Sequence, residues 1–295
     1  MKKSFVFWVE EYLYNPNIFQ KILSYLLSPI SFLYCFVMWL RFKFASPEDF
    51  GIEIISVGNL VVGGSGKTPF VTVLAKEQDY VAIILRGYGR KSSGMIVVKD
   101  REKILVDVEI SGDEAMIYSK KLPHAIVIVS EDRKIAIQKA KEMGVEKIFL
   151  DDAYSKHSIK KQDILLDVTT QNKFCLPSGP YREKLWLGKK AIVLKEGEDF
   201  TRKTTLIDST QKMSLVTAIA RPQRLDPYLP KVVNKHYFED HHTFIKEELE
   251  AILKQDGSES LLVTFKDYVK IEKFGLPLSL LDLELQLKYD KISEL

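Results

Sequence analysis

The chain has 295 residues, which is enough for one large domain or about two of ordinary size. Its residues are 46% hydrophobic and 28% charged, a composition that excludes a disordered or low-complexity protein. The 43 basic and 40 acidic residues nearly balance, so charge gives no indication of nucleic-acid binding. Two cysteines, Cys35 and Cys175, without a C-x-x-C motif favour neither a disulfide framework nor a zinc cluster, and they fit a reducing compartment.

The first feature along the chain is an uncharged apolar run of 19 residues, 22–40, flanked by basic residues. A helix needs about 20 apolar residues to cross a bilayer, and Pro29 and three serines interrupt this run. A cleaved signal peptide is disfavoured, because the run starts late, follows Glu10 and Glu11, and lacks a small-residue cleavage site. A buried globular helix is the alternative to our preferred interpretation, a membrane-embedded or membrane-surface anchor.

Beyond the apolar run, short β-branched segments alternate with polar helical segments. We expect strands at 52–57, 81–85, 125–129, 147–150, 164–168 and 191–194, and helices at 69–76, 113–121 and 132–142. Strand–helix–strand alternation predicts a mostly parallel sheet with helices on both faces. The fold class is therefore α/β.

A second, smaller α/β unit is expected toward the C-terminus. The polar stretch 195–212 is expected to contain a linker, and strands at 214–218, 232–238, 261–264 and 283–287 and a helix at 245–254 follow. The expected organisation is an apolar helical segment at 1–45, a larger domain with its linker at 46–212 and a smaller domain at 213–295.

The strongest motif follows the strand at 52–57. It is the run Gly63, Gly64, Ser65, Gly66, Lys67 and Thr68, after which a helix is expected. Glycines let successive backbone N–H groups surround phosphate oxygens, while Lys67 can reach the β- and γ-phosphates and Thr68 can hold Mg²⁺. Val61 stands where the general P-loop consensus has its first glycine. The alternative is a glycine-rich turn that merely starts a helix.

A second motif ends the strand at 147–150 with Asp151 and Asp152. A hydrophobic strand that ends in aspartate is the usual partner of a P-loop, where the carboxylate holds Mg²⁺ directly or through water. Apolar strands also end in aspartate at ordinary turns, so this motif indicates a metal site only because a P-loop precedes it in the chain. The sequence leaves open which aspartate contacts the metal.

Three further motifs are weaker. Arg86, Tyr88 and Arg90 follow the strand at 81–85 and suit an anionic or sugar-like ligand, although a solvated basic turn would have the same composition. Asp113 and Glu114 open an expected helix, where acidic residues are also ordinary caps. The run 238–242, which includes His241, could bind a metal, supply a base or form a polar turn, and we favour a base or base-orienting role.

Taken together, these motifs resemble the tetraacyldisaccharide 4′-kinases of lipid A biosynthesis. The segments SVGNLVVGGSGKTP, ILRGYGR, SGDEA, LDDAY, LPSGPYRE, IARPQRL, FEDHH and LVTFKDYVK occur in the order typical of that family, whose P-loop also lacks the first glycine. One departure is clear. The family usually continues the acidic pair as DD-x-[FY]-Q-H, whereas this chain has Ser155, Lys156 and His157 after Tyr154. We carry no role over to those positions, and His157 is either a shifted substitute or without a role.

The resemblance implies two α/β/α domains and a kinase that moves the γ-phosphate of ATP to the 4′-hydroxyl of a tetraacyldisaccharide 1-phosphate. It also implies Mg²⁺ as cofactor and a place on the cytoplasmic face of the bacterial inner membrane, and no obligate protein partner is inferred. By resemblance, Asp113 is the base and His241 pairs with it. Lys67 and the loop amides hold phosphates, and Thr68 and the acidic pair hold Mg²⁺.

The resemblance further suggests how the lipid is held. Arg86, Tyr88 and Arg90 would contact the anionic disaccharide, and Glu114 and Glu183 are further candidate site residues. Two alternatives belong to other classes: a membrane-associated P-loop NTPase switch and a non-catalytic membrane adaptor. The intact Gly-Lys-Thr sequence and the acidic pair argue against an adaptor, and a switch would not need the motifs at 86–90 and 238–242.

Overall fold

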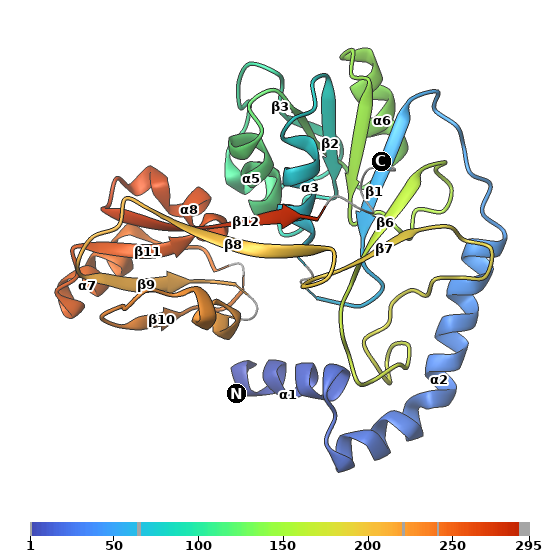
Figure 1. Cartoon of the computed structure of the whole chain (residues 1–295), viewed down its shortest axis with the longest axis horizontal. Helices are drawn as coiled ribbons and strands as arrows, with labels where there is room; N and C mark the ends of the chain where they lie inside the picture. Colours follow the sequence, from blue (N-terminus) through green and yellow to red (C-terminus); the bar gives the residue numbers. More distant parts are fainter. Residues whose placement is uncertain (1, 64–65, 220–221, 241, 289–295) are drawn as a thin grey trace.

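The computed structural model describes residues 2–63, 66–219, 222–240 and 242–288, with side chains from residue 8 onward. The chain forms two α/β parts, each built on its own sheet, and an N-terminal pair of helices that lies along the outside of the larger part (Figure 1). The predicted α/β class with a mostly parallel sheet and a smaller C-terminal part is confirmed.

The larger sheet has seven strands in the order β3-β4-β2-β5-β1-β6-β7, and only β3 runs antiparallel to its neighbour. The strands are β1 (Glu53–Gly58), β2 (Val81–Leu85), β3 (Ile96–Lys99), β4 (Ile126–Val129), β5 (Lys147–Asp151), β6 (Gln162–Asp167) and β7 (Ile192–Lys195). Every residue of β2 and β4 is buried, which explains their unbroken apolar runs. Because β1 and β5 are parallel neighbours, the P-loop and the acidic pair leave the sheet at the same edge.

Helices cover both faces of the larger sheet. On one face, α3 (Lys67–Ala75) and α5 (Asp113–Lys121) bury Phe70 and Tyr118 against the strands. On the other, α6 (Arg133–Glu142) buries Ile137. A short helix, α4 (Val108–Ser111), leads into α5. The phosphate loop therefore ends at the start of α3, on a firmly packed face of the sheet.

The smaller sheet has five strands in the order β10-β9-β11-β12-β8. The strands are β8 (Phe200–Ile207), β9 (Met213–Thr217), β10 (Lys235–Tyr237), β11 (Ser260–Thr264) and β12 (Leu278–Leu287), and the helices are α7 (Lys246–Asp256), α8 (Phe265–Ile271), η1 (Pro222–Tyr228) and η2 (Glu272–Phe274). β8 alone is antiparallel to its neighbour.

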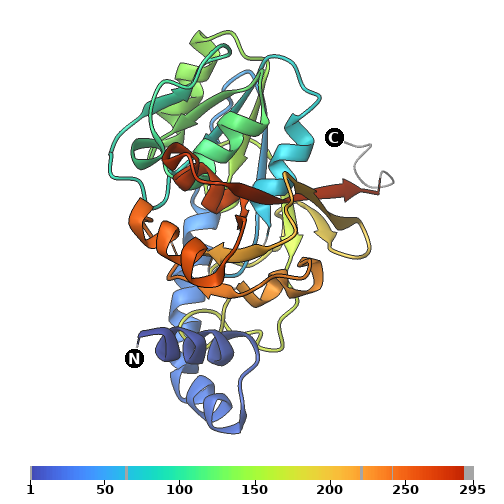
Figure 2. The same ribbon diagram turned by 90° about the vertical axis from the view of Figure 1, so that its left-hand side faces the viewer.

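Strand β8 lies inside the polar stretch 195–212, where the sequence had indicated a linker. It pairs with β12 along its whole length, from Phe200 opposite Leu287 to Ile207 opposite Leu280. β8 is an edge strand with many exposed residues, so it carries threonine, lysine and arginine and lacks the apolar pattern of a buried strand. Figure 2 shows β8 and β12 reaching from the smaller part across to the larger one.

Contacts between the two parts fix the walls of a cleft. Lys120 on α5 forms an ion pair with Glu272 at 2.7 Å, and Lys121 pairs with Asp282 on β12. The rings of Phe70 and Phe200 meet edge to face with centroids 5.5 Å apart. These contacts hold the smaller part against the helices that follow the phosphate loop.

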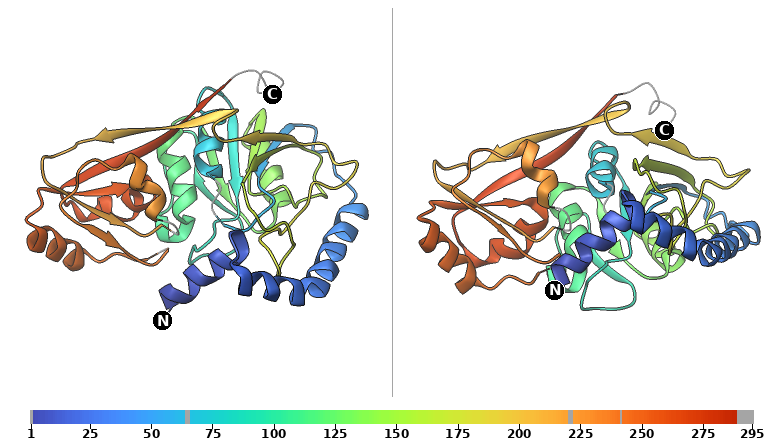
Figure 3. Two further views of the ribbon diagram at one scale, coloured as in Figure 1. Left: turned by 60° about the horizontal axis from the view of Figure 1, so that its bottom comes forward. Right: turned by 90° about the horizontal axis from the view of Figure 1, so that it is seen from below.

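The N-terminal arm consists of α1 (Lys2–Tyr14) and α2 (Ile18–Lys43), which together form an L-shaped arm (Figures 1 and 3). Asn17 caps α2 by accepting a hydrogen bond from the Gln20 backbone N–H at 3.0 Å. Within the described residues, α2 is long and apolar enough to cross a membrane, and only 11% of its most apolar window is buried. Phe19 and Phe32 are 83% and 77% exposed. Such exposure argues against the buried globular helix.

The inner side of α2 is tied to the loop that follows β6. Ser31 donates a hydrogen bond to Ser178 at 2.7 Å, and a disulfide joins Cys35 to Cys175. This disulfide corrects the expectation from the cysteine count, because the two residues are 140 positions apart and no sequence spacing signals that they meet.

We expect the exposed face of α2 to bind lipid. Replacing Leu26, Phe32 and Leu33 together with serine should abolish co-flotation of the full chain with anionic phospholipid vesicles, because these side chains are 61–77% exposed and contribute little to the core. The fold should remain intact by circular dichroism. Serine at Ile135 and Leu187, two exposed apolar residues that do not belong to α2, is the matched control and should leave flotation unchanged. Flotation of the triple variant at the level of the unmodified chain would contradict a membrane role for this face.

Candidate active site

The phosphate loop connects β1 to α3. Gly63 and Gly66 have φ angles of +90° and +80°, a backbone conformation that favours glycine. Gly64 and Ser65 lie outside the described residues. The loop is supported from the segment after β6, since the backbone N–H of Val62 donates to the carbonyl of Pro180 at 2.9 Å. Gly66 immediately precedes α3, so the first free N–H groups of that helix face the loop.

Lys67 is the first residue of α3 and lies among polar partners at the sheet edge. Its Nζ donates to Oδ1 of Asn59 at 3.2 Å and lies 3.6 Å from Oδ1 of Asp152. Arg182 reaches the same place, donating to Asn59 at 2.8 Å and to Oδ2 of Asp152 at 3.0 Å. A lysine and an arginine therefore converge beside the phosphate loop.

Asp151 is the buried member of the acidic pair. Its Oδ2 accepts a hydrogen bond from the Tyr118 hydroxyl at 2.9 Å, while its buried Oδ1 has no hydrogen-bond partner in the described part of the chain. Thr68 interacts with the same tyrosine hydroxyl. Burial raises the pKa of Asp151, and the nearby Lys67 acts in the opposite direction. Thr68 and the Asp151 carboxylate are thus linked through one tyrosine hydroxyl, and the carboxylate keeps one unsatisfied oxygen, which fits the oxygen ligands that Mg²⁺ prefers.

Asp152 differs from its neighbour in conformation and partners. Its φ angle is +52°, which is uncommon for a residue other than glycine. Burial acts to raise the pKa of Asp152, but Lys67 and Arg182 outweigh burial and hold that pKa below its usual range. Asp152 is therefore an ionised anchor for two cations.

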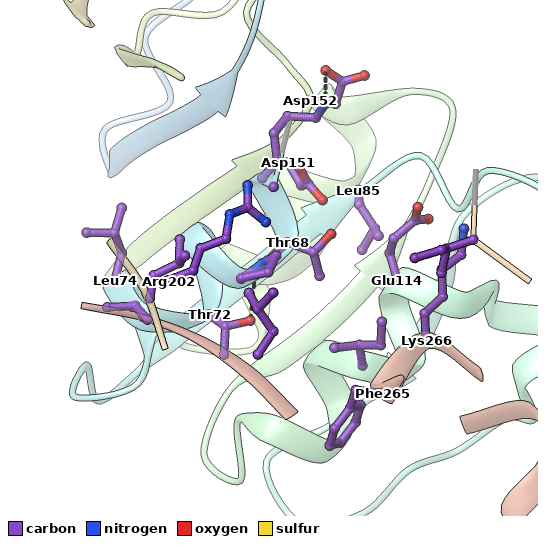
Figure 4. Close-up of a pocket in the computed structure, with 18 of the residues that line it drawn as sticks. Thr68, Thr72, Leu74, Leu85, Glu114, Asp151, Asp152, Arg202, Phe265 and Lys266 are labelled. Atoms are coloured by element: carbon purple, nitrogen blue, oxygen red, sulfur yellow. Dashed lines mark hydrogen bonds and ion pairs between the residues drawn. The ribbon is translucent and has the colours of Figure 1, made fainter. Parts of the chain in front are cut away.

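A cleft of about 1820 Å³ opens over these residues and is lined by both parts of the molecule. Figure 4 shows Thr68, Asp151 and Asp152 on one side, and Glu114, Phe265 and Lys266 on another. Arg86 and Tyr88 also line the cleft. Within the described residues, no group of three histidine, cysteine, aspartate or glutamate side chains could hold a metal by itself, so a metal here would also need Thr68 or bound phosphate as a ligand.

Asp113 stands at the start of α5, where Gly112 packs closely against the loop that contains Tyr88. The Asp113 side chain is 12% exposed, and its Oδ2 lies 3.5 Å from Nζ of Lys270 on α8. His241, its proposed partner, lies outside the described residues. The neighbouring Asp240 lines the cleft and pairs with Lys266 at 3.0 Å.

Two predicted substrate residues have side chains away from the cleft wall. Arg90 is almost fully buried and donates at 2.6 Å both to Glu131 and to the carbonyl of Gly94, so it fixes the 86–90 loop. Glu183 accepts a hydrogen bond from Trp186 at 3.1 Å and lies 3.6 Å from Nε2 of His157.

Several residues on the cleft wall were not picked out from the sequence. Arg133 and Lys156 both line it. Burial lowers the pKa of Arg133 to about 10, and burial together with Arg133 and Arg86 lowers the pKa of Lys156. Lys156 therefore occupies the cleft where the family pattern is broken, whereas His157 is buried against Phe42 and Tyr154. Arg182 adjoins the Glu183 candidate, and only its place beside Asp152 reveals it.

The fold and the site define a P-loop phosphotransferase, because a lysine, a threonine and an acidic pair gather at the phosphate loop in a cleft shared with a second α/β part. The comparisons specify the class further. The model of the family described as Tetraacyldisaccharide-1-P 4′-kinase matches residues 23–294. A Tetraacyldisaccharide 4′-kinase from Aliarcobacter butzleri is 47% identical, with 97% of this chain and 95% of that protein covered.

Two further comparisons agree. A Tetraacyldisaccharide 4′-kinase from Helicobacter pylori is 44% identical over 95% of this chain and 91% of that protein. The crystal structure of LpxK from Aquifex aeolicus in complex with ATP has a TM-score of 0.72 and 26% identity, covering 92% of this chain and 98% of that one. The chain belongs to the tetraacyldisaccharide 4′-kinase family.

The opposite pKa shifts of the acidic pair predict opposite effects on stability. In EDTA at pH 7, Asp151→Asn should raise the urea midpoint, because the folded chain no longer buries a charge whose pKa is raised. Asp152→Asn should lower that midpoint, because its ionised form stabilises the fold.

The pH dependence provides the check. Because the folded-state pKa of Asp151 is raised, ionised Asp151 destabilises the folded chain most at pH values above that pKa. The increase in the urea midpoint caused by Asp151→Asn should therefore shrink as the pH falls toward about 4, the pKa of an aspartate in the unfolded chain. A lowered folded-state pKa means that the Asp152 contribution is present above about 4 and is lost below it. Midpoints that change in the same direction for both variants at pH 7 would refute this assignment.

Proposed function

We propose that this chain transfers the γ-phosphate of ATP to the 4′-hydroxyl of a tetraacyldisaccharide 1-phosphate at the cytoplasmic face of the bacterial inner membrane. One observation carries the proposal: Lys67 and the acidic pair face a cleft that is shared by two α/β parts in a chain of this family. The ATP in the crystal structure of the Aquifex aeolicus relative supports the choice of nucleotide.

The phosphate loop would hold the polyphosphate of ATP. Backbone N–H groups of 63–68 and the Lys67 ammonium would neutralise β- and γ-phosphate oxygens. Arg182 donates hydrogen bonds to both Asn59 and Asp152, and Asn59 also accepts one from Lys67, so these bonds hold the surroundings of Lys67 in place. Catalysis of phosphoryl transfer depends mainly on such positioning and charge neutralisation.

Thr68 and Asp151 are the residues that would hold Mg²⁺. The orphaned Oδ1 of Asp151 supports this assignment, and Asp152 is already engaged by two cations. When bound, the ion supplies positive charge that offsets the charge developing on the transferred group. Tyr118 contacts both side chains, through its hydrogen bond to Asp151 and its interaction with Thr68, and so holds them in a fixed orientation relative to each other.

Asp113 is the proposed base for the 4′-hydroxyl, with His241 as its partner from the smaller part. A sugar hydroxyl is a poor nucleophile near neutral pH, so a positioned proton acceptor is needed. The ion pair with Lys270 of α8 fixes the Asp113 side chain from the smaller part. Movement of the smaller part would therefore change the position of the Asp113 carboxylate, so that the site would be assembled as the cleft closes.

The anionic lipid would bind where cations gather on the cleft wall. Arg86, Lys156 and Arg41, at the end of α2, all line the cleft, and none of these three has a carboxylate partner within the described part of the chain. Tyr88 is 67% exposed on the same wall and offers an aromatic surface to a sugar ring. The acyl chains would extend along the exposed apolar face of α2.

A turnover assay with and without lipid tests the kinase reaction. The full chain with ATP and Mg²⁺ in detergent should release little ADP alone and should form a phosphorylated lipid when an acylated disaccharide 1-phosphate is added. Lys67→Ala should lower kcat by about 100-fold or more, because it removes a preorganised charge from the transferred phosphate. Lys160→Ala, which breaks only the surface pair with Asp49, is the control. Rapid ATP hydrolysis that the lipid does not stimulate would favour an NTPase switch.

A double-mutant cycle tests the base. Asp113→Ala should lower kcat by roughly 10²–10⁴-fold with little change in the KM for ATP, since the aspartate acts on the acceptor hydroxyl. His241→Ala should act in the same direction. The double variant should lose far less than the product of the two single losses, because residues that act as a unit are non-additive. An unchanged kcat in Asp113→Ala would leave this residue as a helix cap.

A further inference from the structure

Arg202 is a cation that β8 brings to the phosphate loop. Arg202 lies opposite Leu285 in the antiparallel pair of β8 and β12. Two residues earlier on β8, Phe200 packs on Phe70 of α3. Its side chain lines the same cleft as Lys67, and in Figure 4 its guanidinium points toward Thr68 and Asp151. The element that carries Arg202 therefore starts beside the helix that follows the phosphate loop.

The contact between Arg202 and the loop is close. A β-carbon placed on Gly66 would lie 3.0 Å from Nη2, 3.6 Å from Cζ and 3.7 Å from Nη1 of Arg202. The guanidinium thus packs against the backbone of the loop at the residue that precedes Lys67. Glycine is needed there for two reasons, the φ angle of +80° and the space that this guanidinium takes.

A single carboxylate holds the guanidinium. Nε of Arg202 donates to Oε1 of Glu196 at 2.5 Å and Nη2 donates to Oε2 at 2.9 Å, a two-pronged pairing. Nη1 has no hydrogen-bond acceptor in the described part of the chain. The fork that binds a carboxylate in this way matches two phosphate oxygens equally well, and an arginine keeps its charge at any ordinary pH.

We propose that Arg202 is a ligand of the nucleotide polyphosphate, presented by β8 and positioned by Glu196. The inference rests on the proposed nucleotide site at the loop 63–68. The balance of charge supports the proposal, because a triphosphate carries more negative charge than the Lys67 ammonium can neutralise. Part of the positive charge of Lys67 is already neutralised by Asp152. A guanidinium against Gly66 adds positive charge without any movement of the larger sheet.

Binding measurements on the full chain in detergent test the proposal without relying on turnover. By calorimetry, Arg202→Gln should weaken ATP binding by about 10-fold to 100-fold, the value of a charge-assisted hydrogen bond pair. The affinity for adenosine should stay within twofold, because the nucleoside lacks phosphate. Arg202→Lys should restore part of the ATP affinity. Lys203→Gln removes the same charge from the next, exposed residue of β8 and should change nothing.

A second variant separates binding from a purely structural role. Glu196→Gln keeps the guanidinium and removes its charged partner, so ATP binding should be retained or strengthened. If the pair only fastened the β7–β8 turn, Glu196→Gln and Arg202→Gln would lower the unfolding midpoint and the ATP affinity alike. Loss of ATP affinity in Glu196→Gln equal to that in Arg202→Gln would therefore overturn the proposal, as would an unchanged ATP affinity in Arg202→Gln.

Lys67→Ala distinguishes this inference from the proposed function. If Lys67→Ala binds ATP as tightly as the unmodified chain, the nucleotide site itself is misplaced and the inference falls with it. If Lys67→Ala loses ATP while Arg202→Gln keeps it, the nucleotide site stands and only the role of Arg202 is refuted.

Discussion

The pairing of Arg182 with Asp152 is the interaction on which the geometry of the site depends. It joins the end of β5 to the segment after β6, and through Asn59 it also reaches the end of β1. Asp152 adopts its positive φ angle at this junction, a conformation that persists only when its surroundings enforce it. Without Arg182, Lys67 would face Asp152 alone and would be drawn toward a carboxylate instead of the phosphates.

The same segment connects the site to the N-terminal arm. The Tyr34 hydroxyl of α2 donates to the carbonyl of Arg182 at 3.1 Å, and Ser31 and Cys35 hold the segment further upstream. α2 thus packs on the backbone that presents Arg182 to Asp152. The helix that we assign to the lipid surface is a structural neighbour of the nucleotide site, so removing the arm would disturb more than membrane contact.

Sequence reasoning recovered the buried parts of this architecture because burial leaves a signal in residue type. β2 and α5 have the predicted bounds, 81–85 and 113–121. β8 was missed because an exposed edge strand is stabilised by its partner β12, whose paired residues lie 73 or more positions away, and needs no apolar pattern of its own. The disulfide was missed for the same reason, since its two residues meet only in the folded chain.

The site shows the same division between local and non-local information. The sequence indicated Lys67, Asp151 and Asp152 because their neighbours in the chain form a recognisable pattern, and the structure brings all three together. It could not reveal the direction of a side chain in a loop. Arg90 and Arg86 are equivalent in the sequence, yet one is buried against Glu131 and the other lines the cleft. Three-dimensional contacts also single out Lys156 over its neighbour His157.

The arrangement along α2 explains how one helix can serve both a lipid and a phosphate. Phe32 and Leu33 are exposed in its apolar part, and Arg41 lines the cleft near its end. From Phe32 to Arg41 a helix rises about 14 Å, about twice the roughly 5–8 Å depth of one headgroup layer. With the apolar part of α2 at the acyl chains, Arg41 would stand at or above the level of the phosphates. The cleft would then open toward a substrate whose lipid part stays in the membrane, and the chain would phosphorylate it without extracting it.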